Sequence, residues 1–188
     1  KTYEKQRKLM RKIDFDDMLL LCYDLFRRRP DILEQWQKRF RYILIDEFQD
    51  VNRIQYEVVR MLAMPENNLF VVGDDDQSIY HFRGASPEIM LGFGEDYPET
   101  EIILLDVNYR SSRNIVNGAL RVISNNSRRY KKKLVTSGDK GACIHVQEAK
   151  DAKEESKYLI DKIREAEKEG IPHSDMAVLY RTANDARV

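Results

Sequence analysis

The sequence of 188 residues is poor in cysteine and contains no long apolar run. Its only cysteines, Cys22 and Cys143, stand far apart, which excludes a disulfide framework and a cysteine-based zinc site and fits a reducing compartment such as the cytoplasm. No apolar stretch approaches the roughly 20 residues that cross a membrane, so no membrane association is expected.

The chain also lacks an excess of charge of either sign. Its 32 Lys and Arg residues equal its 32 Asp and Glu residues, so no overall positive field attracts nucleic acid, and any nucleic-acid site must be local. The clearest basic runs are residues 27–29 and 128–133. Because charged runs are usually solvated surface, we expect both to be exposed.

What the sequence does contain is an alternation of short apolar segments with helical patterns. Strands are predicted at residues 41–46, 69–73, 102–105, 142–147 and 176–180. Helices are predicted after Asp14 up to Pro30, around Ile54–Leu62, after Ser86-Pro87, and at Ser111–Ile123 and Ala152–Glu169, the last one closed by Gly170. Strands that are apolar on both faces and alternate with helices predict an α/β fold with parallel sheets covered on both sides.

Polar clusters directly follow three of the predicted strands, where ligands bind in such folds. The clusters are Asp46-Glu47, Gly73–Gln77 and Asn108-Tyr109-Arg110. An Asp-Glu pair that ends an apolar strand is typical of the Walker B motif of ATPases, in which the first carboxylate holds Mg²⁺ and the second activates water. Two acids alone are better explained by helix capping, so the neighbouring residues decide the interpretation.

Those neighbours resemble UvrD/Rep/PcrA-type superfamily 1 DNA helicases over nearly the whole chain. Residues 46–50 (Asp-Glu-Phe-Gln-Asp) resemble motif II of the family, residues 71–85 resemble motif III, and residues 105–112 resemble motif IV. Residues 14–17 and 177–181 are similar to two further family segments. The order and spacing also agree.

The resemblance implies a site for ATP and Mg²⁺. Asp46 would hold the metal, Glu47 would activate the attacking water, and Gln77 would sense the γ-phosphate. Tyr109 would stack on the adenine, and Arg110 would reach the γ-phosphate from a second domain, where an arginine stabilises charge that develops in phosphoryl transfer.

A surface for single-stranded DNA is implied by Tyr80, Phe82 and Arg83. Aromatic side chains stack on unpaired bases of any sequence, and an arginine adds phosphate or cation–π contact. The family typically has Trp where this chain has Phe82, which offers a smaller stacking area. Core packing explains Tyr80 equally well.

The implied fold is RecA-like, with parallel sheets flanked by helices, present as incomplete parts of two domains. Residues 1–106 correspond to the later part of domain 1A, and residues 107–188 to the start of domain 2A. The implied activity is ATP-dependent 3′–5′ unwinding of DNA in repair or replication, on single-stranded DNA and 3′-tailed duplexes.

The sequence also lacks a phosphate-binding loop. No Gly-Lys dipeptide occurs, although the loop that cradles nucleotide phosphates requires one before Ser or Thr. The chain starts at Lys1 without an initiator methionine. We therefore expect a piece of a longer helicase, which alone neither hydrolyses ATP nor unwinds DNA.

Three alternatives remain open at this stage. A metal-dependent nuclease could use Asp14, Asp16, Asp17, Asp46 and Glu47 as ligands, but that leaves Gln77 and the motif around Arg110 unexplained. The chain could also belong to the motor of an AddA/RecB-like helicase-nuclease. The third alternative is a non-catalytic DNA-binding module descended from a helicase.

Overall fold

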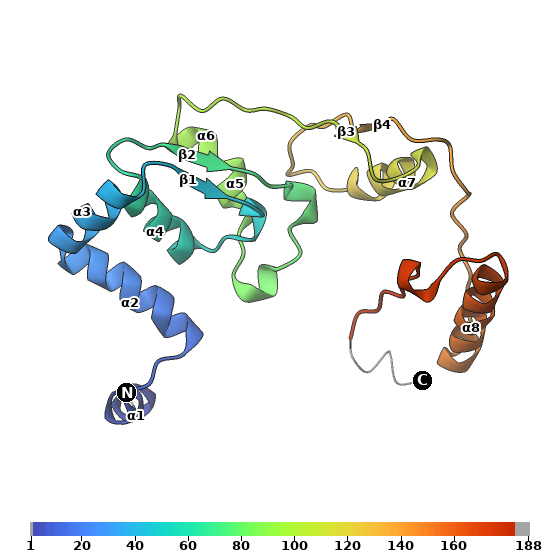
Figure 1. The fold of residues 1–188 in the computed structure, drawn as a ribbon, viewed down its shortest axis with the longest axis horizontal. Helices are drawn as coiled ribbons and strands as arrows, with labels where there is room; N and C mark the ends of the chain where they lie inside the picture. The colour runs from blue at the N-terminus through green and yellow to red at the C-terminus, as the bar shows by residue number, and fades with distance from the viewer. Residues whose placement is uncertain (1, 183–188) are drawn as a thin grey trace. The chain divides into compact units, whose positions relative to one another are not determined.

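The computed structural model describes residues 2–182 and divides them by contact into two compact units, residues 2–140 and residues 141–182. The first unit combines helices with short strands, and the described part of the second unit contains one helix and one 3₁₀ turn (Figure 1). Among the described residues, no helix is both long enough and apolar enough to cross a membrane.

The first unit begins with three helices, α1 (Thr2–Met10), α2 (Phe15–Arg28) and α3 (Pro30–Arg39). Asp14 caps α2 as predicted, because its carboxylate accepts a hydrogen bond from the backbone N–H of Asp17, 2.7 Å away. The Asp17 carboxylate in turn accepts one from the backbone N–H of Asp14. Pro30 stops α2 and also starts α3, where proline suits the first turn since no N–H is needed there.

A parallel pair of strands lies at the centre of the first unit. The strands β1 (Ile43–Ile45) and β2 (Leu69–Val71) pair with Ile43 opposite Leu69 and Ile45 opposite Val71. They are connected by the helix α4 (Arg53–Ala63), which Asn52 caps, and α2, α3 and α4 pack together. The first two predicted strands and the intervening helix are therefore confirmed, although the strands are shorter than predicted.

One face of this sheet carries the hydrophobic core. Phe48 and Tyr56 are fully buried and pack with Ile89 of α5 (Pro87–Leu91) and Phe93 of α6 (Phe93–Asp96). The Phe48 ring meets the rings of Tyr56 and Phe93 edge to face, with centroids 5.9 Å and 5.5 Å apart. This core fixes the segment that follows β1, where the first polar cluster lies.

The opposite face of the same strands is open among the described residues. Leu44 of β1 is 71% exposed and Phe70 of β2 is 57% exposed. The prediction of a sheet covered on both sides is thus met on one face only. The alternation of buried and exposed residues follows from the two-residue period of a strand.

A second, smaller strand pair completes the first unit. The strands β3 (Val107–Asn108) and β4 (Val135–Thr136) pair in parallel, and the helix α7 (Arg113–Ile123) packs on β4. The prediction of a strand at residues 102–105 was wrong, because pairing begins only at Val107. An apolar run becomes a strand only where another strand binds its backbone, and among the described residues the first such contact is that of Asp106 with Val135.

The second unit contains the helix α8 (Ala152–Lys168) and the 3₁₀ turn η4 (His173–Asp175). The predicted helix is confirmed, with Asp151 as its cap and Gly170 in the left-handed region at φ 84°. The predicted strands at residues 142–147 and 176–180 do not form in the described part of the chain. Val146 and Leu179 are almost fully exposed there, so no partner sheet buries them.

Candidate nucleotide and DNA site

Asp46 and Glu47 lie at the carboxyl end of β1, where the backbone turns sharply. Glu47 adopts the left-handed conformation (φ 50°, ψ 43°), which is strained for a residue with a side chain. The next residue, Phe48, donates its backbone N–H to the carbonyl of Val72, 2.9 Å away, and so ties this turn to the end of β2. Both carboxylates remain exposed to solvent.

Gln49 connects this turn to the second polar cluster. Its side chain is buried, with 1% exposed, and lies in the 3₁₀ turn η1 (Phe48–Asp50). The Gln49 amide donates a hydrogen bond to the Glu47 carboxylate at 2.7 Å, and its oxygen accepts one from the backbone N–H of Asp74 at 2.9 Å. One side chain therefore fixes Glu47 relative to the loop that carries Gln77.

Gly73 allows this close approach. A Cβ atom at this position would lie 2.6 Å from the side-chain oxygen of Gln49 and 3.1 Å from the backbone nitrogen of Phe48. Real Cβ atoms essentially never come as near as 2.6 Å to another atom, so a larger residue at position 73 would displace the Gln49 side chain or separate the two loops.

Gln77 closes the short turn η2 (Asp75–Gln77), which Asp74 caps. The Asp74 carboxylate accepts a hydrogen bond from the backbone N–H of Asp76 at 3.1 Å and another from the Gln77 side-chain amide at 2.8 Å. Glu47, Gln49, Asp74 and Gln77 thus form one continuous hydrogen-bonded series across the ends of β1 and β2.

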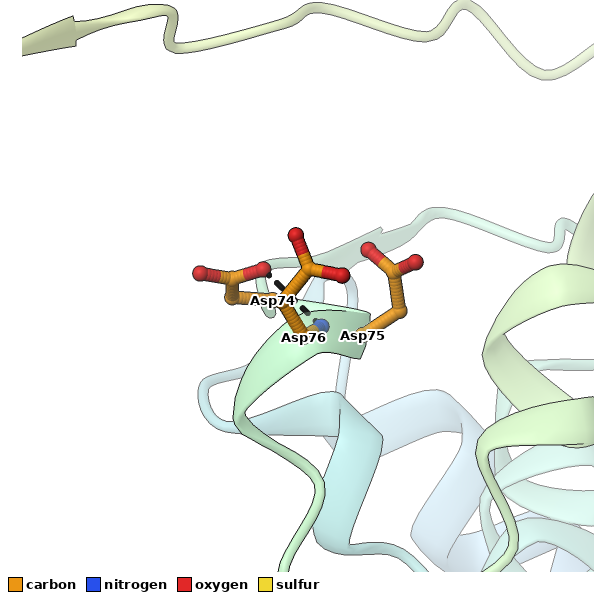
Figure 2. Close-up of side chains that lie close together, drawn as sticks. All are labelled: Asp74, Asp75 and Asp76. Carbon is orange, nitrogen blue, oxygen red and sulfur yellow. Dashed lines mark hydrogen bonds between the residues drawn. The ribbon is translucent and has the colours of Figure 1, made fainter. Parts of the chain in front are cut away.

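Three consecutive carboxylates, those of Asp74, Asp75 and Asp76, lie on one side of this turn (Figure 2). A cluster of this kind resembles a metal site, but Lys132 occupies its centre. The Lys132 ammonium forms ion pairs with Asp74 and Asp75 and approaches the Asp76 carboxylate to 3.2 Å. Arg129 adds a two-pronged contact to Asp76, with one N–O distance of 2.7 Å.

These cations change the acidity of the loop. Burial alone would raise the pKa of Asp74, but hydrogen bonds from Lys132 and Gln77 outweigh burial and hold that pKa below its usual value. The Arg129 guanidinium has the same lowering effect on the pKa of Asp76. Lys132 stays protonated, since its carboxylate neighbours more than offset burial and raise its pKa.

The expectation of solvent exposure for residues 128–133 was therefore only half right. Lys131 and Lys133 are exposed, whereas the side chains of Arg129 and Lys132 are only 15% and 13% exposed and bind the acidic loop. The run at residues 27–29 is exposed, as predicted.

Tyr80, Phe82 and Arg83 cluster just beyond Gln77, around the 3₁₀ turn η3 (His81–Arg83). Phe82 is 76% exposed, and its ring lies 5.8 Å from that of Tyr80, which is partly exposed. The Arg83 guanidinium lies over both rings, 5.1 Å from the Tyr80 centroid and 5.5 Å from the Phe82 centroid. An exposed aromatic pair with a cation is the arrangement that binds unpaired bases.

Asn108 is the last residue of β3, and Tyr109 and Arg110 follow it. The Asn108 side chain accepts hydrogen bonds from the backbone N–H groups of Arg110 (3.0 Å) and Ser111 (2.8 Å) and so shapes the turn. Tyr109 is 82% exposed, and Arg110 is exposed as well. Within residues 2–182, no hydrogen bond or ion pair joins the Arg110 side chain to Asp46, Glu47 or Gln77.

The aspartates at the start of α2 serve the helix. Asp14 and Asp17 form its capping box, and Asp17 also pairs with Arg7. Neither lies in the cluster of carboxylates that could together hold a metal, which the described residues show only at positions 74–76. None of the five ligands of the nuclease alternative belongs to that group. Asp46 remains suited to Mg²⁺, which binds through one or two carboxylates and keeps several waters.

Sequence reasoning missed Gln49, Arg129 and Lys132. A buried glutamine between two loops gives no local signal beyond its place in motif II. For the two cations, the only clue was the run of three adjacent aspartates, whose mutual repulsion a nearby cation would relieve.

Comparisons with known proteins agree with the family resemblance. A profile of the UvrD/REP helicase N-terminal domain matches residues 1–98, and a profile of the UvrD-like helicase C-terminal domain matches residues 103–188. The protein YjcD of Bacillus subtilis is 48% identical over 185 residues, which cover 98% of this chain and 24% of YjcD. The ATP-dependent DNA helicase PcrA of Staphylococcus aureus is 44% identical over 186 residues, 99% of this chain and 26% of PcrA. PcrA of Staphylococcus epidermidis is 44% identical over 188 residues, 100% of this chain and 26% of that PcrA. The chain thus spans about a quarter of the length of these relatives.

Proposed function

This chain belongs to the UvrD/Rep helicase family, and we propose that it supplies one part of an ATP-driven motor that moves along single-stranded DNA and unwinds duplex DNA. The PcrA relatives are named ATP-dependent DNA helicases. Polarity in the 3′–5′ direction, action in repair or replication and use of 3′-tailed duplexes are part of the proposal.

The observation that carries the proposal is the hydrogen-bonded series from Glu47 to Gln77. Gln49 holds the Glu47 carboxylate at 2.7 Å and the backbone of Asp74 at 2.9 Å, and Asp74 in turn binds Gln77 at 2.8 Å. A group that activates water and a group that senses phosphate must be held in register, because misplacement of either lowers the rate. This series is a direct means of holding them.

In this proposal each residue of the series has a chemical role. Asp46 helps to hold Mg²⁺, which would neutralise phosphate charge when bound. Glu47 accepts a proton from the attacking water. Gln77 presents its amide to the γ-phosphate. Tyr109 stacks on the adenine, and Arg110 stabilises negative charge that develops on the phosphate oxygens. Tyr109 and Arg110 are both exposed, so their side chains can contact a nucleotide that other residues of the site also bind.

DNA binding is assigned to Tyr80, Phe82 and Arg83. Phe82 contributes a stacking surface, and Arg83 contributes positive charge next to it. These residues lie within six positions of Gln77 in the sequence. A change in the conformation of the Gln77 loop on nucleotide binding would therefore move the residues that bind DNA.

The proposal also includes the RecA-like fold, with residues 1–106 as part of domain 1A and residues 107–188 as part of domain 2A. Because no Gly-Lys dipeptide is present, the phosphate loop would come from another segment, and the 188 residues alone would be inactive. In bacteria, to which the matching relatives belong, ATP and chromosomal DNA share the cytoplasm, so we place the protein there.

The test is Glu47→Gln in the full-length helicase that contains this chain. The substitution keeps the size of the side chain and removes the base, so ATP and DNA binding should persist while ATP turnover falls by orders of magnitude. Glu99→Gln, at an exposed position outside the site, is the matched control and should retain full turnover. Unchanged turnover in Glu47→Gln would exclude Glu47 as the base. ATP hydrolysis by the purified 188 residues would disprove the predicted inactivity.

A further inference from the structure

We propose that Lys132 is a positioning residue for Gln77, acting through the carboxylate of Asp74. This inference rests on the proposed function, since it assumes that Gln77 responds to the nucleotide. Lys132 lies in the segment between α7 and β4, 58 positions after Asp74 in the sequence, yet its ammonium forms an ion pair with that residue.

The first support is electrostatic. The carboxylate oxygens of Asp74, Asp75 and Asp76 lie within 4.8 Å of one another, a spacing at which ionised carboxylates repel strongly. Lys132 contacts all three and is only 13% exposed, so little water screens the interaction. Without this cation, Arg129 would still pair with Asp76, but Asp74 and Asp75 would lose their only ion pairs among the described residues, and their mutual repulsion would change the shape of the turn.

The second support is the short path from Lys132 to Gln77. The two oxygens of Asp74 have different partners, since Oδ1 binds Lys132 and accepts the backbone N–H of Asp76 at 3.1 Å, while Oδ2 accepts the Gln77 amide at 2.8 Å. The Asp76 N–H belongs to the same turn and moves with it, whereas Lys132 holds the Asp74 carboxylate from a distant segment of the chain. The backbone N–H of Asp74 binds Gln49, which fixes the main chain but not the carboxylate.

The third support is the anchoring of the segment that carries Lys132. The backbone N–H of Tyr130 donates to the Asp75 carboxylate at 2.8 Å, and its hydroxyl donates to the carbonyl of Met90 in α5 at 3.1 Å. Arg129 binds Asp76 on the same side. These contacts place residues 129–132 firmly against the Gln77 loop, so a movement of this segment would be transmitted to Gln77.

The experiment compares Lys132→Met with Lys131→Met in the full-length helicase. Lys131 is exposed and belongs to the same basic run, so both variants lose one positive charge next to the site. We expect Lys132→Met to lower the kcat of DNA-stimulated ATP hydrolysis about tenfold, with little change in the KM for ATP, since interacting residues of this kind are coupled by that order. Lys132→Arg should recover most of the loss, because the charge is retained.

A fall in kcat for Lys132→Met alone, reversed by Lys132→Arg, supports the inference. Equal kcat values for Lys132→Met and Lys131→Met overturn it, as does a loss that Lys132→Arg does not reverse at all, which would indicate packing. If Lys132→Met fails to fold, Lys132→Gln replaces it with the same expected outcomes. Gln77→Ala separates the two proposals: full turnover in that variant refutes the role of Gln77, whereas low turnover there with normal turnover in Lys132→Met refutes only the role of Lys132.

Discussion

The side-chain oxygen of Gln49 accepts a hydrogen bond from the backbone N–H of Asp74 at 2.9 Å and joins the loops that follow β1 and β2. The same side chain donates to Glu47 at 2.7 Å. Because the buried Gln49 side chain makes both contacts, it determines the geometry of the site as well as its stability.

Gln49→Ala should lower the free energy of unfolding by about 1–3 kcal/mol, because the Asp74 N–H is left without its partner in a buried place. Gln55→Ala is the control, since the Gln55 side chain also accepts a hydrogen bond from a backbone N–H, that of Asn52, but lies at the exposed start of α4. Urea denaturation of both variants measures the difference. Equal losses would mean that the Gln49 contacts add nothing beyond those of an ordinary helix cap.

Gly73→Ala should also destabilise the protein, by about 1–3 kcal/mol, because the added Cβ would lie 2.6 Å from the Gln49 oxygen. Gly94→Ala provides a matched control, since its Cβ would meet no atom within 4 Å and the residue lies in the helix α6. That variant should be neutral or slightly more stable. Thermal melting distinguishes the two, and a neutral Gly73→Ala would show that the loops can separate freely.

Phe82→Ala should weaken binding of single-stranded DNA by about 1–3 kcal/mol, the range typical of a stacking aromatic. Phe15→Ala, which removes a phenylalanine that is equally exposed but lies at the start of α2, should leave the affinity unchanged. Fluorescence anisotropy with a labelled oligonucleotide, at one fixed salt concentration, measures both. If the two variants bind alike, Phe82 does not stack on bases.

Acid should destabilise the loop at residues 74–76. The pKa values of Asp74 and Asp76 are lowered in the folded state, so their contribution to stability is complete above the unfolded-state pKa of about 3.9 and is lost as pH falls through the lower folded-state values. The raised pKa of Lys132 acts at the other end, where its contribution is lost as pH rises through that value.

Urea denaturation between pH 6 and pH 2 tests this linkage. The variant with both Asp74→Asn and Asp76→Asn should lose less stability over this range than the unchanged protein, because it has fewer carboxylates to protonate. Asp161→Asn, at an exposed position of α8, should follow the unchanged protein. Identical pH profiles for all three proteins would contradict the assigned ion pairs.

Local sequence signals predicted the elements that depend on local contacts. The cap at Asp14 was sufficient for α2, the helical spacing of apolar residues for α4, and a charged run closed by Gly170 for α8. The predictions of strands at residues 102–105, 142–147 and 176–180 were wrong. An apolar run indicates a segment that can be buried, but it does not indicate whether another strand is available to pair with it.

The same limit applies to the site. Motif spacing was enough to single out Asp46, Glu47 and Gln77 as residues of one site, because the ends of neighbouring parallel strands meet at one edge of a sheet. The contact of Lys132 with Asp74 spans 58 positions and depends on how residues 129–132 fold back onto the loop. No periodicity or short motif carries that information.

Glu47 has a backbone conformation that glycine would adopt more easily, at φ 50°. For a residue with a Cβ this conformation costs roughly 1–2 kcal/mol, which Glu47→Gly would relieve. The same change removes the carboxylate that accepts a hydrogen bond from the buried Gln49 amide, a loss of about 1–3 kcal/mol. The two effects oppose each other, so a screen for thermostable variants would not be expected to return a glycine here, and the contact with Gln49 offsets the strain of the glutamate.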